Sequence, residues 1–208
     1  SSPGDLATIT KAQLDGDFLD ATLERLRSAQ TIAILRGTKP DLMVERAKEL
    51  VDSGITALEI TLDSTDALAT LQRLRAELPP DILIGVGTVS KPLEQLPKAN
   101  SHGAVFCLAA DFPDGMIEVA LQLQMVAMVG AASLSQVADA VAAGARAVKL
   151  FHAEKDWEEE TLRKCQLNHP EITLVPVGGI GPDDRNRWES RGFTLLGMGE
   201  KLAGLDLK

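Results

Sequence analysis

Short apolar runs recur along the chain, and longer stretches of mixed polarity separate them. Each run is rich in Val, Ile, Leu and Ala and contains few charged residues. Near-continuous apolar runs of this length are typical of parallel strands that are covered on both faces. The pattern predicts eight such strands, over residues 31–36, 57–62, 82–89, 104–109, 126–131, 147–151, 172–179 and 194–199.

The stretches between the runs carry signals for the ends of helices. Pro40 and Pro182 stand where helices should begin, because proline is favoured in the first helical turn. Ser133 can cap another helix through its side-chain oxygen. Glycines follow three of the stretches, as is common at helix C-termini: Gly54, Gly144 and Gly192.

Eight alternations of strand and helix favour an α/β fold of the (β/α)8 TIM-barrel type, with an open doubly wound sheet as the alternative. Residues 11–30 predict an extra N-terminal helix, so that residues 1–30 form an N-terminal extension and helix. We expect one domain over residues 1–208, since barrels of this length commonly form a single domain. The short tail after Lys201 predicts an abbreviated last helix.

The charge of the chain limits its partners. It has 30 acidic and 21 basic residues and a formal net charge of -9. Nucleic acids and anionic membrane surfaces favour basic patches, so neither is an expected partner. No stretch reaches the roughly 18 apolar residues of a membrane span. An anionic small molecule could still bind in a local pocket.

The cysteines and the first ten residues bear on the cellular compartment of the protein. Cys107 and Cys165 are too few for a disulfide framework, and reduced thiols are the expected state. Residues 1–10 lack the basic and apolar regions of a signal peptide and look like a tag remnant or a trimmed leader. A cytoplasmic location is therefore expected.

Two charged residues interrupt apolar runs. Lys149 lies in "AVKLF" and Glu59 in "ALEITL". Lys149 either reaches solvent or lies inside, where desolvation lowers its pKa and leaves a nucleophilic amine for a Schiff base. Glu59 is either part of a buried structural pair or a general acid and base. The pattern alone leaves both alternatives open for Lys149, and we favour the acid–base role for Glu59.

Polar residues also stand at the ends of strands, where barrels carry their chemistry. Arg36 could be solvated or could bind an anion with its guanidinium. Thr88 presents a hydroxyl after the third strand. Gly85 and Gly87 would let a ligand approach the backbone closely, but without a third glycine they are a weak nucleotide signal.

The glycines after the seventh strand suggest an anion site. Gly178 and Gly179 precede Pro182, and backbone N–H groups at a helix N-terminus can bind phosphate. A simple glycine turn is the alternative. No two of the three histidines have the spacing of a metal site, and there is no Cys/His cluster, so we expect no metal and no other cofactor.

Six short motifs, taken together, resemble a known family. They are "IAILRG", "LEITL", "GVGTV", "VKLFHAE", "VPVGGI" and "GMGEKL", in this order along residues 30–204. This set resembles the 2-keto-3-deoxy-6-phosphogluconate (KDPG) and 2-keto-3-deoxy-6-phosphogalactonate aldolases, a group that includes the 4-hydroxy-2-oxoglutarate aldolases. The resemblance implies a (β/α)8 barrel that assembles as a homotrimer, with a Schiff-base lysine and no metal.

The resemblance also assigns roles to residues. It implies that Lys149 forms the Schiff base and that Glu59 moves protons. It implies that Thr88 holds the pyruvyl carboxylate, that Phe151 packs beside the iminium, and that Arg36 binds an acidic end of the substrate. Two further residues would cradle the phosphate, namely Gly178 and Gly179.

The chain departs from the family pattern at several positions. His152 replaces a common proline, Asp63 stands where some members have arginine, and Glu200 stands where the family has a serine near the phosphate. Two unit charges about 4 Å apart interact by roughly 4 kcal/mol at an effective dielectric near 20, so a carboxylate there would repel phosphate. We expect Glu200 to turn away, to be protonated, or to pair with Lys201 or Arg36, unless the substrate lacks phosphate.

Three hypotheses for function follow. The first is a class I aldolase that cleaves KDPG into pyruvate and glyceraldehyde 3-phosphate. The second keeps the lysine but takes unphosphorylated 4-hydroxy-2-oxo acids or decarboxylates oxaloacetate. The third is an inactive barrel that binds a metabolite, motivated by Glu200 and by family prolines that are replaced at Ala110, Val129 and His152. Joint retention of Lys149, Glu59 and Thr88 favours an enzyme.

Overall fold

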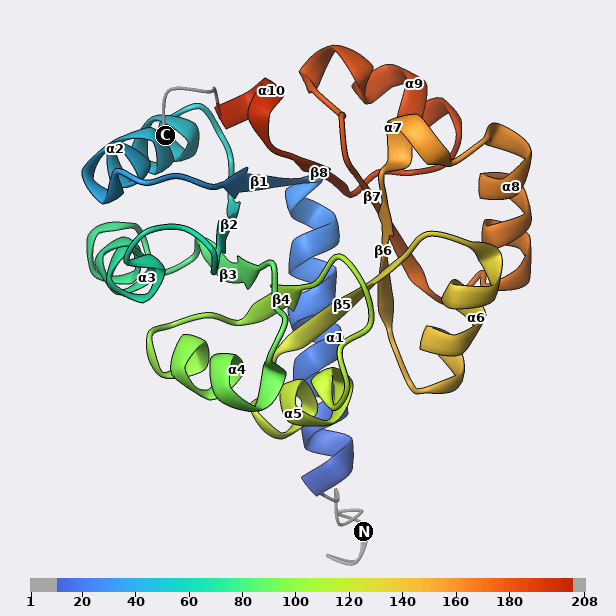
Figure 1. Ribbon diagram of the computed structural model, residues 1–208, viewed down its shortest axis with the longest axis horizontal. Coiled ribbons are helices and arrows are strands. Elements are labelled where there is room, and N and C mark those ends of the chain that lie inside the picture. Colours follow the sequence, from blue (N-terminus) through green and yellow to red (C-terminus); the bar gives the residue numbers. More distant parts are fainter. Residues whose placement is uncertain (1–10, 204–208) are drawn as a thin grey trace, which may run out of the picture.

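The computed structural model describes residues 11–203 and shows eight parallel strands closed into a barrel (Figure 1). β1 pairs with both β2 and β8, so that Ala33 lies between Leu58 and Met198. The α/β TIM-barrel prediction is confirmed, and the open-sheet alternative is wrong. The strands are β1 (Thr31–Leu35), β2 (Ala57–Thr61), β3 (Leu83–Gly87), β4 (Phe106–Leu108), β5 (Val126–Ala131), β6 (Ala147–Phe151), β7 (Thr173–Val177) and β8 (Leu196–Met198).

Helices surround the barrel (Figure 1). They are α1 (Lys11–Ala29), α2 (Pro40–Asp52), α3 (Ala67–Glu77), α4 (Pro92–Ser101), α5 (Met116–Gln122), α6 (Leu134–Ala142), α7 (Ala153–Asp156), α8 (Glu159–Asn168), α9 (Arg185–Ser190) and α10 (Glu200–Ala203). In the part of the chain that the structure describes, none of these helices is both long and apolar enough to cross a membrane.

The predicted helix signals act as expected at most positions. The Ser133 hydroxyl accepts a hydrogen bond from the backbone N–H of Gln136 at 3.2 Å and caps α6. Gly54 follows α2 with a φ of +109°, a conformation that favours glycine. Pro182 differs, because it begins a 3-10 turn, Pro182–Asp184, ahead of the short α9.

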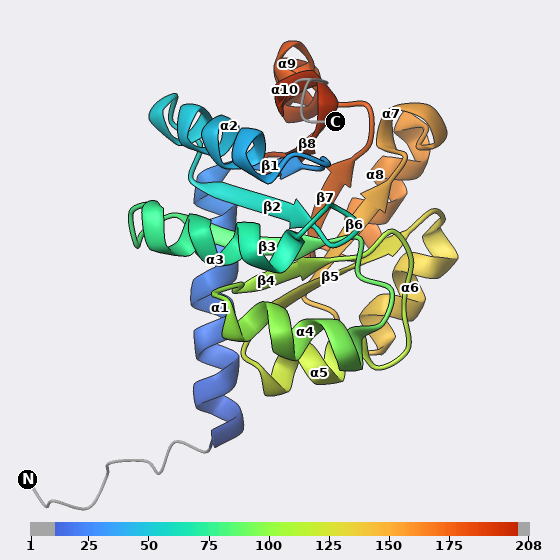
Figure 2. The same ribbon diagram turned by 60° about the vertical axis from the view of Figure 1, so that its left-hand side comes forward.

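The N-terminal helix closes the bottom of the barrel. Figure 2 shows α1 lying across the end at which the strands begin. Leu19, Leu23 and Leu26 are buried in one cluster with residues at the starts of several strands. The N-terminal helix predicted for residues 11–30 is therefore confirmed, whereas the predictions for residues 1–10 and for the tail beyond Ala203 lie outside the described residues.

Several strands are shorter than predicted, for reasons in the backbone. The predicted strand 82–89 ends at Gly87, because Thr88 has a left-handed φ of +57° that extended structure excludes. The predicted strand 172–179 ends at Val177, because Gly178 has a φ of +116°. Both departures turn the chain at the C-terminal end of the barrel, where the candidate site lies.

Strand alternation places Lys149 inside the barrel. Its neighbours Val148 and Leu150 belong to the apolar layer between the barrel and the helices, whereas Ala147 belongs to the interior layer. Successive side chains of a strand point to opposite faces, so Lys149 points inward with Ala147. The lysine is therefore an interior residue, and the solvent alternative is wrong.

Candidate active site

Lys149 lies in the barrel interior against an aromatic ring. Its side chain is buried, with 6% of the residue exposed. Its Nζ atom lies 4.2 Å from the centre of the Phe151 ring, two residues along β6. This alternation brings the two inward side chains of one strand together, and the ring shields the amine from water.

Glu59 enters the interior from β2. The residue is 2% exposed, and its Oε1 atom is buried with no hydrogen-bond partner in the described part of the chain. The other oxygen, Oε2, occupies the space that a side chain at Gly87 would need. A buried carboxylate oxygen without a partner is costly, which marks it as a group kept for a ligand or for chemistry.

The two glycines of β3 make room for protein side chains. A Cβ at Gly87 would collide with the Glu59 carboxylate, and a Cβ at Gly85 would collide with the Phe106 ring. The prediction that these glycines admit a ligand to the backbone is therefore wrong. Gly87 instead allows Glu59 to fold against β3, its neighbour in the barrel.

Burial changes the protonation of both ionisable groups. Desolvation lowers the pKa of the Lys149 ammonium, while the Glu59 carboxylate opposes this shift and the Arg36 charge adds to it. Desolvation raises the pKa of Glu59, and the charges of Lys149 and Arg36 oppose that shift. Burial therefore favours the uncharged form of each group, and the charge of each opposes that shift in the other.

Arg36 and Thr88 meet above this pair. The Arg36 Nη2 atom donates a hydrogen bond to Thr88 Oγ1 at 2.9 Å, and its Nε atom lies 3.5 Å from Asp63 Oδ1. About half of the Arg36 side chain is exposed, so it remains available to an anion from solvent. The loops after β1, β2 and β3 thus form one cationic and hydroxyl-bearing corner of the site.

A buried network that the sequence did not suggest holds this corner. The Ser64 hydroxyl lies 2.8 Å from Thr61 Oγ1 and accepts a hydrogen bond from the Gly37 N–H at 3.1 Å. The network ties the loop after β2 to the residue next to Arg36. Ser64 looks like an ordinary loop residue in the sequence, and only its partners distinguish it.

The glycine turn after β7 packs on the turn after β6. Gly178 and Gly179 have φ of +116° and +78°, and a Cβ at Gly178 would lie 2.9 Å from His152 Cα. The backbone N–H of Gly181 donates to Asp184 Oδ2 at 2.9 Å. This N–H group, which the anion hypothesis would offer to phosphate, is already used by a carboxylate of the same turn.

The neighbours of Lys201 and Arg36 bear on the expectation that one of them pairs with Glu200. Glu200 is exposed at the start of α10, just after β8. Lys201 Nζ lies 3.9 Å from Asp184 Oδ2, and Arg36 lies with Asp63 and Thr88. The two cations proposed as partners of Glu200 therefore have other carboxylates beside them.

No metal-binding group of His, Cys, Asp and Glu side chains occurs within residues 11–203. Cys107 is buried near Glu59, and desolvation raises the pKa of its thiol well above the usual value, so the thiol is unreactive.

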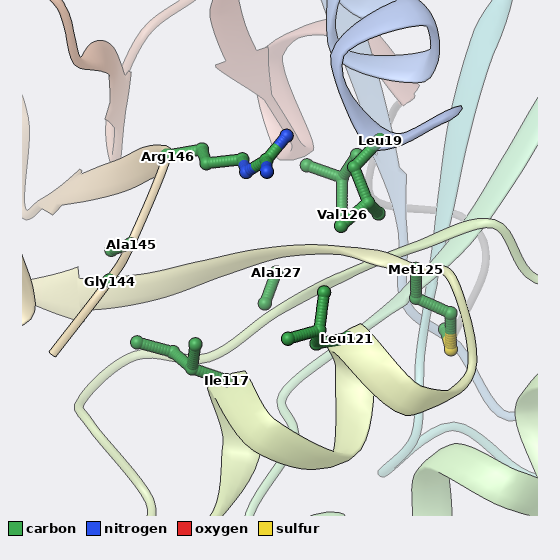
Figure 3. A pocket seen from close by; sticks show the side chains of 9 residues that line it. All are labelled: Leu19, Ile117, Leu121, Met125, Val126, Ala127, Gly144, Ala145 and Arg146. Atoms are coloured by element: carbon green, nitrogen blue, oxygen red, sulfur yellow. The ribbon is translucent and has the colours of Figure 1, made fainter. Parts of the chain in front are cut away.

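A separate cavity of about 120 Å³ lies between α1, α5 and the start of β5 (Figure 3). It contains none of the predicted site residues.

Comparison with known proteins places the chain in a family. The family model of KDPG and KHG aldolases matches residues 22–207. The chain belongs to the KDPG and KHG aldolase family. It is therefore a carbon–carbon lyase of the aldolase type, and the resemblance drawn from the six motifs is confirmed.

Individual relatives agree with this assignment. The 2-dehydro-3-deoxy-6-phosphogalactonate aldolase of Escherichia coli K12 is 28% identical over 82% of this chain and 83% of its own. A 2-dehydro-3-deoxy-phosphogluconate aldolase of Pseudomonas aeruginosa is 31% identical over 74% of this chain and 69% of its own. The structure of KDPG aldolase from Legionella pneumophila has a TM-score of 0.76 at 23% identity, covers 86% of this chain and 85% of its own, and holds pyruvate captured at low pH as a covalent carbinolamine.

Proposed function

We propose that the protein is a Schiff-base aldolase that cleaves a 4-hydroxy-2-oxo acid into pyruvate and an aldehyde. The observation that carries this proposal is a lysine amine buried inside the barrel, with a lowered pKa, facing a buried carboxylate. A neutral amine attacks carbonyl carbon, and the resulting iminium accepts electrons. The carbinolamine in the Legionella protein supports the same chemistry here.

The proposed reaction begins with Lys149. Its neutral amine attacks the C2 ketone and forms a carbinolamine, which loses water to give an iminium. Glu59, as a carboxylate, then takes the proton from the C4 hydroxyl, directly or through one water. The C3–C4 bond breaks, the aldehyde leaves, and the bonding electrons move to the iminium as an enamine.

The second half of the reaction restores the enzyme. The protonated Glu59 returns its proton to C3 of the enamine, and water hydrolyses the pyruvate iminium to release pyruvate and the free amine. The iminium itself is the electron sink, so this chemistry needs no metal and no other cofactor. Oxaloacetate could lose CO2 at the same iminium.

The remaining site residues would bind the substrate. Arg36 and Thr88 would hold the carboxylate beside C2, and Phe151 would pack against the iminium. The glycine turn at Gly178 and Gly179 would face the far end of the substrate. KDPG, which would give glyceraldehyde 3-phosphate, is the default substrate from the names of the relatives, and an unphosphorylated 4-hydroxy-2-oxo acid is the alternative.

Borohydride trapping tests the proposal. The protein is incubated with pyruvate, reduced, and digested, and the peptides are read by mass spectrometry. We expect the reduced pyruvate adduct on Lys149, and no adduct there and no aldol cleavage in Lys149→Ala. Folded protein that gives no adduct at saturating pyruvate would instead support the inactive barrel that binds a metabolite.

A further inference from the structure

The loops at the mouth of the barrel carry charge of opposite sign on its two sides. The loops after β1, β2 and β3 (residues 36–39, 62–66 and 88–91) contain three cations and two carboxylates. The loops after β6, β7 and β8 (residues 152–158, 178–184 and 199–201) contain six carboxylates and two lysines. We call these the cationic side and the acidic side of the mouth.

The cationic side is where a carboxylate can approach the reactive amine. The charge of Arg36 acts on both Lys149 and Glu59. Arg36 also donates to Thr88 Oγ1. Asp63 balances part of the charge of Arg36, so this corner suits a single anionic group.

The acidic side occupies the place where barrels commonly bind phosphate, at the loops after the seventh and eighth strands and a short helix. Here the Gly181 N–H already donates to Asp184. Arg187, one of two arginines in the adjacent α9, donates hydrogen bonds to Asp184 at 3.0 Å and to Glu154, and Lys201 Nζ lies 3.9 Å from Asp184 Oδ2. One backbone donor and two cations on this side, namely the Gly181 N–H, Arg187 and Lys201, therefore have carboxylates of the chain itself beside them.

We infer, on the basis of the proposed function, that the substrate is a 4-hydroxy-2-oxo acid whose carboxylate binds on the cationic side and whose far end is uncharged and hydroxylated. A phosphate or second carboxylate at the far end would approach the acidic side, where like charges repel it. An uncharged polyol end meets no such penalty, and carboxylates can accept hydrogen bonds from its hydroxyl groups.

Kinetics on matched substrates test the inference. Release of pyruvate is measured with KDPG and with its dephosphorylated counterpart, 2-keto-3-deoxygluconate, while pyruvate trapping on Lys149 is recorded in the same preparation. We expect kcat/KM to be at least about tenfold higher for the unphosphorylated acid. Asp184→Asn retains an acceptor for the Gly181 N–H, and both Asp184→Asn and Glu200→Gln should raise kcat/KM for KDPG relative to the other acid.

Glu118→Gln is the matched control, because it removes the same charge from an exposed position on α5. It should leave the ratio of the two kcat/KM values unchanged. If the protein forms the adduct but prefers KDPG, the inference is wrong and the proposed function still holds. The same conclusion follows if all three variants change the ratio of the two kcat/KM values equally. Absence of both adduct and cleavage overturns the two together.

Discussion

At the scale of single residues, the proposed chemistry depends on two groups that water would normally keep charged. Lys149 and Glu59 come from opposite parts of the barrel, β6 and β2, and each is almost fully buried. Because each charge stabilises the other and Arg36 acts on both, the protonation of the pair responds to every neighbouring charge. The pH dependence of trapping should therefore report these interactions directly.

We expect the two neighbours to shift the trapping profile in opposite directions. Only neutral Lys149 attacks pyruvate, so the rate of trapping rises with pH through the pKa of the amine, which lies below its usual value of 10.5. Glu59→Gln removes a charge that raises this pKa and should move the midpoint to lower pH. Arg36→Gln removes a charge that lowers it and should move the midpoint to higher pH.

Borohydride trapping at saturating pyruvate, repeated across pH, measures both midpoints. Saturation matters because Arg36→Gln should also weaken binding of the pyruvate carboxylate. Shifts in the same direction, or of reversed sign, would show that the electrostatic assignment of the pair is wrong.

At the scale of elements, the helix that covers the bottom of the barrel and the candidate site lie at opposite ends of the strands. α1 closes the end at which the strands begin, and its leucines pack into the interior layer of the barrel. The reactive groups and the loops that surround them lie at the other end. Changes in α1 should therefore affect unfolding without changing the site.

Leu26→Ala tests this separation. Leu26 is fully buried in the cluster beneath the barrel, and removal of such a side chain costs about 2–5 kcal/mol of unfolding free energy. Denaturant unfolding followed by circular dichroism gives the value, and the rate of pyruvate trapping should stay that of the native protein. Leu167→Ala is the control, because Leu167 is 71% exposed on α8 and should change neither quantity.

At the scale of the whole molecule, the assembly and the location of the protein remain predictions. The resemblance implies a homotrimer, and the cytoplasmic location expected from the sequence stays a prediction. The described part of the chain has apolar side chains on its surface, with Leu93 at 73% exposed and Phe18 at 48%. Such side chains are common in monomers and do not by themselves define an interface.

A measurement of mass tests the trimer. Sedimentation equilibrium of the full chain should give three times the 22.2 kDa of one protomer, over a range of protein concentrations. A mass equal to that of one protomer at micromolar concentration would contradict the trimer. Pyruvate trapping on the same sample would then show whether the monomer is active.

The sequence by itself determined the order of elements and the family. Apolar runs of strand length, proline and glycine at helix ends, and six short motifs in register all depend on local chemistry, so they can be recognised without coordinates. The same local rules placed Lys149 and Glu59 in strands and picked out Arg36 and Thr88 at strand ends. They left open which way Lys149 points.

Only the tertiary structure decided that Lys149 points inward and that the Glu59 carboxylate fills the space beside Gly87. It also decided that Arg36 pairs with Thr88 and Asp63. Each of these joins residues that are far apart in the chain and meet because the strands close into a barrel. The two charged sides of the mouth arise in the same way. Closure gathers loops from separate strands, so their charges act together on one substrate.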